Sequence, residues 1–506
     1  MFNMRMHCSL FSPMNSTPKI AHKLLVFKCL ALFFVHICCA QEGVAVAVGD
    51  QGDSHPVVNK QAVHALVPKD VPPQSMLGLF PQADAENKTL FTLEDTFQRI
   101  SSDNLTVLLN REGVEEALQA SYMERSKLFP QINLRARQVR NQIDNVGRGL
   151  GSLGSIEFPP ANRFDGLLEG SMAVFDLRKW ADYKLAKKGY QISDASYKDL
   201  LQDVLSASGQ AFFNYLRDLT RSEVIEANIV RDTVLLELAQ AQFEAGVAMR
   251  LDVTRAEVRL AEDLREKLQQ ETRVLRSETE FKRLLNYDYA TPLELRRWIG
   301  TAAPSDLDVP IDWILSKRSD YHVAKLETER AKLDRKAAGW DQLPSAFVFG
   351  DYGYASSDAF KRHKDNVWQI GVKLSMPVFE GFRIRSNKLR TNAVVREKEY
   401  QIQDLTKRIE QEYLVGSQNL KSRYQQIAIT QKKLELSQEE LELARDRFEN
   451  GVADNRDVVD AQNGLALAQD EYIDAIYQYN LGRLSLARIL GNVWLILEDV
   501  NKAKVF

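Results

Sequence analysis

The chain has 506 residues, of which 44% are hydrophobic and 27% are charged. This composition is sufficient for a large buried core and excludes a compositionally disordered chain. The formal net charge of -3 gives no reason to expect a nucleic-acid partner.

The first 40 residues, 1–40, have the pattern of an export signal peptide. Three lysines precede an apolar run at 29–39, which ends at Ala40. The run is about 11 residues long, which suits a signal peptide and is too short for the roughly 20 residues of a membrane-spanning helix. All four cysteines lie in this segment, so the exported chain is predicted to contain no disulfide. Attachment of a lipid at Cys39 is the alternative use of the same segment.

Proline positions outline the rest of the chain. Residues 41–90 contain five prolines and are predicted to form an extended N-terminal arm. Two long stretches, 161–291 and everything after Pro377, contain none. Because an interior proline is the strongest helix breaker, these two stretches predict very long helices.

The first half is predicted to contain a short helix, a long helix and a second shorter one. Acidic residues in its first turn favour a helix from 92 to about 127. Apolar residues recur with helical spacing from 177 to 244, Gly246 ends this long helix, and the pattern resumes from 252 to 285. At 1.5 Å per residue, the long helix would extend about 100 Å.

Two segments between the first short helix and the long helix have a different period. After Pro130, Ile132 and Leu134 alternate with polar residues, and a second alternating segment runs from 168 to 174. A period of two with one apolar face predicts a pair of strands.

The chain contains a long internal duplication. At a fixed offset of 205, residues 239–261 and 444–466 are identical at eleven of 23 positions. Two long copies exclude a solenoid of many short repeats. The same elements are therefore predicted twice, in a first repeat at 91–290 and a second repeat at 312–491.

The second repeat is predicted to contain helices at 312–338, 383–449 and 457–490, in register with those of the first repeat. Residues 291–311 are predicted to be a linker between the repeats. Residues 492–506 are predicted to be a C-terminal tail.

The strand pair recurs in the second repeat with more aromatic residues. One segment begins at Phe347 and continues through Tyr352 and Tyr354. The next carries four large apolar residues that alternate with polar ones, namely Trp368, Ile370, Val372 and Leu374. Transmembrane strands need ~9 to 11 residues of this alternation, with aromatic residues near the interfaces. These four residues are therefore predicted to face a membrane, and an amphipathic hairpin packed on a soluble core is the alternative.

Four strands do not suffice for a membrane barrel, because such barrels begin at about eight strands. An open sheet edge in lipid would leave backbone groups unpaired at a cost of several kcal/mol each. Several subunits are therefore expected to share one barrel, with the polar face of the strands lining water.

An ordered set of motifs carries a resemblance to a known family. In chain order the motifs are Phe91-Thr92-Leu93-Glu94, Leu128-Phe129-Pro130, Gln342-Leu343-Pro344, Met376-Pro377-Val378-Phe379-Glu380-Gly381, Gly451-Val452 and Asp457-Val458-Val459-Asp460-Ala461. In this order, from about 90 to about 490, they resemble the outer-membrane efflux protein (TolC) family. The resemblance implies a mainly α chain with a small β part. Duplicated long-helix hairpins would form an α-barrel, and four strands per subunit would contribute to a trimeric 12-stranded transmembrane β-barrel.

The resemblance also implies a location, a function and partners. A homotrimer held by outer-membrane lipid, with its tunnel in the periplasm, would dock to an inner-membrane pump through a periplasmic adaptor protein. It would be the exit duct of an efflux or type I secretion system, with no catalytic centre, cofactor or metal. A periplasmic coiled-coil scaffold without a pore is the alternative function. The sequence does not specify whether drugs, metals or proteins are exported.

Two helix turns lie at the periplasmic tip of the channel according to the resemblance, and there they contact the adaptor. They are Gly246-Val247 and Gly451-Val452. A tight reversal needs a residue that accepts positive φ, which explains a glycine at each turn. Some family members carry a basic latch residue just after the second turn. This chain has Ala453 there, and Arg250 or Arg456 would have to replace the latch.

Three carboxylates at this tip are implied to form the gate, namely Asp252, Asp457 and Asp460. Asp457 and Asp460 are three residues apart and so share one helix face. Three subunits would bring six such carboxylates around one axis, where they attract cations and resist anions. Capping of the helix start by Asp454 or Asp457 is the alternative.

Overall fold

The computed structural model describes most of the chain after residue 89. The described residues are 90–141, 161–246, 248–296, 303–304, 309–358, 365–449, 452 and 455–497. The predicted signal peptide with Cys39, nearly all of the N-terminal arm, parts of the linker and tail, and Val247, Gly451, Ala453 and Asp454 lie outside them. The described residues belong to two compact units, a sheet unit (Met123–Trp180 with Trp340–Glu380) and a helical unit that contains the others.

The described residues of the first half of the chain include four helices. They are α3 (Leu93–Asp103), α4 (Leu105–Ser126), α5 (Leu177–Glu244) and α6 (Arg250–Leu284). The long helix α5 has the predicted bounds, and its 68 residues extend about 100 Å. The start and end of α6 lie within two residues of the predicted ones.

The prediction of one continuous helix from 92 to 127 is wrong at Asn104, where the backbone is extended (φ -67°, ψ 125°). Its Oδ1 accepts hydrogen bonds from the backbone N–H groups of Thr106 (2.9 Å) and Val107 (3.1 Å), which is the geometry of an N-cap. Its Nδ2 donates to the carbonyl of Leu284 (2.7 Å) at the end of α6. The break is therefore fixed by a cap and by a contact with a distant segment.

The part of the second half that the structure describes has four corresponding helices. They are α7 (Ile311–Lys317), α8 (Ser319–Trp340), α9 (Arg383–Glu449) and α10 (Asn455–Ile489). The long helix α9 again has the predicted bounds.

The single helix predicted at 312–338 is also wrong, because it breaks at Arg318 (φ -78°, ψ 122°). The turn after α10 packs against this break. Gly491 has a φ of 89°, and a Cβ on it would lie 2.8 Å from the carbonyl oxygen of Lys317. The break thus accommodates a close backbone approach that only glycine permits.

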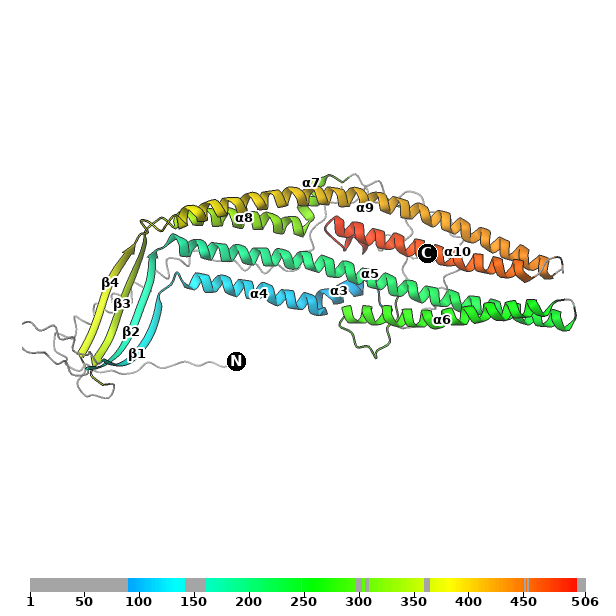
Figure 1. Ribbon diagram of the computed structural model, residues 1–506, viewed down its shortest axis with the longest axis horizontal. Coiled ribbons are helices and arrows are strands. Elements are labelled where there is room, and N and C mark those ends of the chain that lie inside the picture. Colours follow the sequence, from blue (N-terminus) through cyan, green and yellow to red (C-terminus); the bar gives the residue numbers. More distant parts are fainter. Residues whose placement is uncertain are drawn as a thin grey trace, which may run out of the picture. The chain divides into compact units, whose positions relative to one another are not determined.

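The sheet unit contains one antiparallel sheet in the order β1-β2-β3-β4 (Figure 1). Its strands are β1 (Gln131–Asn141), β2 (Ala161–Phe175), β3 (Ser345–Ser356) and β4 (Asp365–Ser375). The pairing of β2 with β3 joins the two halves of the chain. Among the described residues, β1 and β4 are the edge strands of this sheet.

The core of the helical unit extends along helix pairs. α10 lies along α9, and α6 lies along α5 (Figure 1). On α9, buried apolar residues recur every seventh position at Leu420, Ile427, Leu434, Leu441 and Phe448, which is coiled-coil packing. A larger aromatic cluster forms where α3, α5, α6 and α10 meet; it includes Phe97, Phe212, Phe213, Phe281 and Tyr477. Among the described helices, none has a stretch long and apolar enough to cross a membrane.

Candidate functional site

The register of the sheet brings the apolar residues of all four strands to one face. One row across the sheet pairs Leu134 with Leu168, Leu168 with Tyr352, and Tyr352 with Trp368. Because side chains alternate between faces along a strand, residues two positions away join the same face. The large residues of this apolar face are Ile132, Leu134, Phe164, Leu168, Met172, Val348, Tyr352, Tyr354, Trp368, Ile370, Val372 and Leu374.

This apolar face is open to its surroundings within one chain. Trp368 is 60% exposed, and Val372 and Leu374 are each 72% exposed. A contiguous exposed apolar surface of this kind marks a site of contact with lipid or with another protein. The predicted membrane-facing residues of β4 therefore lie together on one exposed surface.

The opposite face of the same sheet carries the charged side chains, with apolar exceptions such as Phe347 and Phe349 of β3. Arg135 forms an ion pair with Glu169 across β1 and β2, and Glu169 pairs in register with Asp351 of β3. Gln369 of β4 completes this row. A sheet with one apolar face and one mainly polar face has the pattern of a wall between hydrocarbon and water.

The turn between α5 and α6 has the expected backbone geometry. Gly246 has a φ of 74°, and the N–H of Ala248 donates to the carbonyl of Gln242 (3.2 Å), which closes the end of α5. Val247, predicted to contact the adaptor, lies outside the described residues.

Asp252, predicted as a gate residue, has a buried carboxylate at the start of α6. Its Oδ2 accepts a hydrogen bond from the N–H of Met249 (3.0 Å), and its Oδ1 lies 3.6 Å from Nη1 of Arg255. An acidic side chain here stabilises the positive end of the helix dipole. The geometry of Asp252 is that of a helix cap.

At the turn between α9 and α10 the carboxylates are exposed, in contrast to the buried Asp252 at the turn between α5 and α6. Val452 is exposed, and its N–H donates to the carbonyl of Arg447 (2.9 Å). The Asp457 side chain is 49% exposed, with Oδ2 3.8 Å from Nη1 of Arg447. The Asp460 side chain is 68% exposed, with Oδ2 3.6 Å from Nε of Arg456. Both predicted gate carboxylates thus lie on the surface of α10 near its start.

A groove of about 490 Å³ between α9 and α10 includes these carboxylates. Its charged lining consists of Glu439, Glu440, Arg447, Asp457 and Asp460. Four carboxylates against one guanidinium give the groove a negative potential. Glu439 and Glu440 were missed in the sequence, because only the reversal of the chain brings this part of α9 beside the start of α10.

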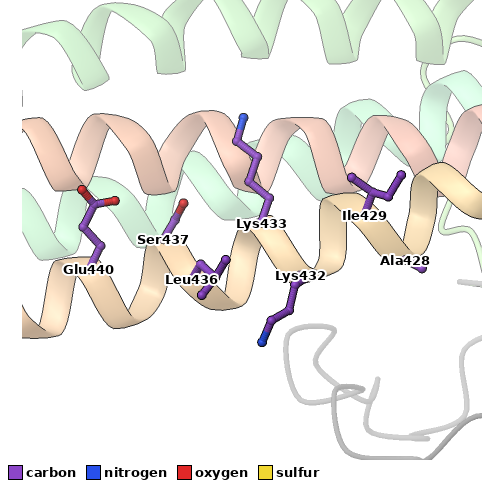
Figure 2. A pocket seen from close by; sticks show the side chains of 7 residues that line it. All are labelled: Ala428, Ile429, Lys432, Lys433, Leu436, Ser437 and Glu440. Carbon is purple, nitrogen blue, oxygen red and sulfur yellow. The ribbon is translucent and has the colours of Figure 1, made fainter.

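A second groove of about 540 Å³ runs along α9 (Figure 2). It is lined by Ala428, Ile429, Lys432, Lys433, Leu436, Ser437 and Glu440. Ile429, Leu436 and Leu443 follow one another at seven-residue spacing and are all exposed. The buried row of α9 that faces α10 uses other positions, such as Leu434 and Leu441. This exposed row, here called the outer seam, therefore has the spacing for packing a further helix.

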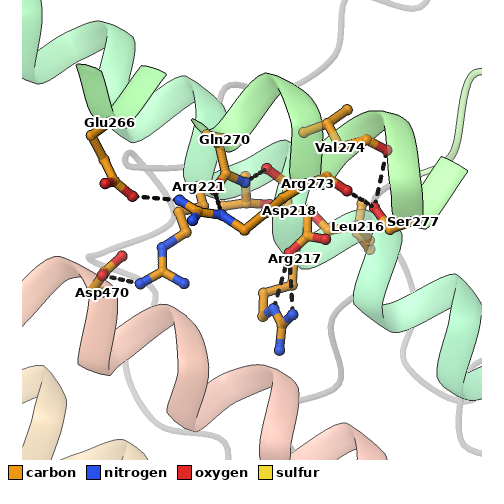
Figure 3. A network of polar contacts seen from close by, with 11 residues as sticks. Leu216, Arg217, Asp218, Arg221, Glu266, Gln270, Arg273, Val274, Ser277 and Asp470 are labelled. Atoms are coloured by element: carbon orange, nitrogen blue, oxygen red, sulfur yellow. Dashed lines mark hydrogen bonds and ion pairs between the residues drawn. The ribbon is translucent and has the colours of Figure 1, made fainter. Parts of the chain in front are cut away.

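A polar network joins the two halves of the chain at the middle of the helical unit (Figure 3). Arg221 of α5 forms an ion pair with Asp470 of α10. On the other side of α5, Nε2 of Gln270 on α6 donates to the carbonyl of Asp218 (2.6 Å), and Arg217 lies 3.2 Å from the Asp218 carboxylate. These contacts fix α5 between α6 and α10 and support the surfaces described above.

Comparison with known proteins gives consistent matches over most of the chain. The sequence profile described as "Outer membrane efflux protein" matches residues 100–287 and 311–492. Outer membrane protein TolC of Vibrio cholerae serotype O1 is 23% identical over 414 residues, covering 77% of this chain and 87% of that protein. Outer membrane protein TolC of Escherichia coli K12 is 22% identical over 455 residues, covering 83% of this chain and 85% of that protein.

A solved structure has the same fold. CusC superposes with a TM-score of 0.70 at 17% identity, and the match covers 84% of this chain and 99% of that one. In CusC, conformational changes accompany folding and the formation of a transmembrane channel. The predicted combination of long-helix hairpins with a small sheet is therefore that of a known channel fold.

Proposed function

The chain belongs to the outer membrane efflux protein family, and we propose that three copies of it share one 12-stranded barrel and one helical tunnel. Its relatives are outer-membrane channels of efflux systems, and the chain itself is an outer-membrane exit duct for such a system. The family is a channel family and not an enzyme family. We propose that the chain is built of a first repeat at 91–290 and a second at 312–491, and the internal duplication supports this division.

The observation that carries the shared barrel is the two-faced sheet with two free edges. β1 and β4 are edge strands, and their unpaired backbone groups would cost several kcal/mol each in hydrocarbon. Joining β4 of one copy to β1 of the next, three times, closes a barrel of 3 × 4 strands. Its apolar face would then contact lipid, and its charged face would line water.

The helical unit supports the same assembly. The outer seam of α9 has a counterpart on α6, where Leu251, Val258, Leu268 and Leu275 are exposed. Apolar rows on two helices of different repeats suit packing between neighbouring copies. We infer that these rows close the tunnel wall between subunits.

The shared barrel predicts that the protein behaves as an integral pore. Full-length protein should sediment with the outer membrane, require detergent for extraction, migrate as a trimer and conduct ions in planar bilayers. If the protein were instead a periplasmic coiled-coil scaffold, it would be soluble in water and would not conduct ions. That alternative is disfavoured by the exposed Trp368, Val372 and Leu374, which a soluble hairpin would have to cover.

The gate is proposed to lie at the turns of the two hairpins. Exposed Asp457 and Asp460 would project six carboxylates from three copies into the tunnel axis. For Asp252, the buried cap geometry supports a structural role at the start of α6 in place of the gate role. The turns at Gly246-Val247 and Gly451-Val452 are proposed to contact a periplasmic adaptor that links the duct to an inner-membrane pump.

Replacing both Asp457 and Asp460 with alanine is expected to reduce the preference of the pore for cations and its block by trivalent cations. The reason is loss of the negative charge that attracts cations to a narrow aperture. Reversal potentials in planar bilayers under a salt gradient measure this preference. Glu442→Ala, which removes an exposed carboxylate of α9, serves as the matched control. Unchanged selectivity in the double variant would refute the pore assignment.

A further inference from the structure

Three charged side chains are buried between α5 and α6. Asp232 comes from α5, and Arg259 and Asp263 come from α6. Their side chains are 3%, 10% and 10% exposed, in that order. Arg259 contacts both carboxylates, with Nε 3.4 Å from Oδ2 of Asp232 and Nη2 3.0 Å from Oδ1 of Asp263.

The hydrogen bonding of this cluster is incomplete. Oδ2 of Asp232, Oδ2 of Asp263 and Nε of Arg259 are buried and have no hydrogen-bond partner among the described residues. One guanidinium therefore faces two carboxylates in a region that excludes water. Two ionised carboxylates with a single buried cation are strongly unfavourable, and a bound proton removes the excess charge.

Charged groups around the cluster do not remove this excess. Glu262, beside Arg259 on α6, is 57% exposed and adds negative charge (3.8 Å from Arg259 Nη1). The guanidinium of Arg231 on α5 donates to Asn228 and lies 3.5 Å from Oε1 of Gln469 on α10. Its charge also acts on both carboxylates of the cluster, but it lowers the pKa of Asp232 less than Arg259 does. Arg445 of α9 is a further nearby cation and acts on Arg231.

These surroundings raise the pKa of the Asp232 carboxyl to about 7. Burial is the main cause, the charge of Arg259 opposes it, and the neighbouring Asp263 carboxyl adds to it. The Asp232 carboxyl therefore gains its charge near neutral pH, although an ordinary aspartate has done so by about pH 4.

The duplication provides a comparison within the same chain. At the offset of 205, Asp232, Arg259 and Asp263 correspond to Ser437, Gly464 and Ala468. The α9–α10 hairpin thus reverses and packs with small uncharged residues at these positions. Because the fold of the hairpin does not require the buried charges, the α5–α6 hairpin carries them as an additional property.

We propose that Asp232 and Asp263 share one proton in the closed α5–α6 hairpin, and that release of this proton near neutral pH loosens the hairpin. A carboxyl whose pKa is raised by folding contributes its full stabilisation below its ordinary pKa of 3.8. That stabilisation is lost as the pH rises toward about 7. The α5–α6 hairpin is therefore tightest in acid and weakest under alkaline conditions, whereas the α9–α10 hairpin lacks this response.

Hydrogen exchange of the full-length protein in detergent, read by mass spectrometry at pH 5.5 and pH 8.5, tests this proposal. After correction for intrinsic exchange, amides of α5 and α6 around the cluster should exchange roughly 30-fold faster at the higher pH, because about 1.5 pH units separate pH 5.5 from the pKa of about 7. Amides at the equivalent positions of α9 and α10 should show no such increase.

Two variants separate the shared proton from a general effect of pH. Asp263→Ala introduces the residue that the second hairpin has at this position, and Asp232→Asn keeps the size of the side chain without its charge. Both are expected to remove the pH response of α5 and α6 while the hairpin stays folded. A wild-type response in either variant, or equal responses of the two hairpins in the unaltered protein, would overturn the proposal. The exchange experiment does not measure conduction. Failure of this proposal can therefore be distinguished from failure of the proposed duct function.

Discussion

Replacing Val372 with arginine is expected to abolish assembly of the protein in the outer membrane. Val372 lies on the apolar face of β4, two residues past the centre of the strand, and is 72% exposed within one chain. An arginine at the bilayer midplane on the lipid face of a membrane barrel costs ~2 to 4 kcal/mol. A trimer contains the substitution at three equivalent sites, so this cost applies three times in one barrel. The measurement is the amount of folded trimer in the outer-membrane fraction, together with conductance in planar bilayers.

The same strand supplies the control for this substitution. Gln369 lies on the polar face of β4, three positions before Val372. Gln369→Arg adds the same charge to the side proposed to line water, and trimer yield is expected to stay at the wild-type level. Wild-type yield of Val372→Arg would refute the membrane assignment of the apolar face. An equal loss in both variants would refute the assignment of the two faces.

Replacing Arg318 with alanine is expected to lower the unfolding free energy by about 1.5 to 3 kcal/mol, the usual contribution of hydrogen bonds to charged groups. The Arg318 side chain is 8% exposed and lies at the break between α7 and α8. It donates to both carboxylate oxygens of Asp320 (3.0 and 2.6 Å) and to Oε2 of Glu412 on α9 (2.7 Å). Its loss leaves two carboxylates without their shared cation. Urea unfolding in detergent, followed by circular dichroism, measures the change.

The control for this effect is an ion pair of similar length on the surface. Arg408 on α9 lies 2.7 Å from Asp404, and both side chains are more than half exposed. Exposed pairs on helices contribute little, so Arg408→Ala is expected to leave the unfolding transition nearly unchanged. Equal effects of the two substitutions would show that burial of Arg318 has no energetic consequence.

Acid gives a second readout of the Arg318 site. Burial by itself would raise the pKa of Asp320, but the hydrogen bonds and charge of Arg318 outweigh burial and hold that pKa below its ordinary value. Asp320 therefore stabilises the fold above its ordinary pKa, and this contribution is lost as the pH falls. In Arg318→Ala this part of the acid dependence should disappear.

Local sequence patterns were sufficient to locate most elements. The long helices α5 and α9 begin and end where the sequence predicts. The prediction rests on stretches without proline in which apolar residues recur with helical spacing. The four strands include the segments of alternating residues. The alternation separates an apolar face from a mainly polar one, with Phe347 and Phe349 of β3 as exceptions on the polar side. Helical spacing and alternation depend on residues within a few positions of one another, so a single sequence contains them. The motif order likewise identified the family, which the profile match confirms.

The sequence alone did not locate the breaks or the buried charges. The interruptions at Asn104 and Arg318 depend on partners far along the chain, Leu284 for the first and Glu412 for the second. Nothing in the sequence around Asp252 distinguishes a cap from a gate residue.

The amino-acid sequence by itself determined the elements, their duplication and the two-faced character of the strands. Only the tertiary structure decided which strand residues form one row, which glutamates join Asp457 in a groove, and that Asp232 meets Arg259 and Asp263. The physical reason is that periodicity is a property of neighbouring residues. Burial, register and ion pairing depend on where the reversal of each long hairpin brings distant residues together.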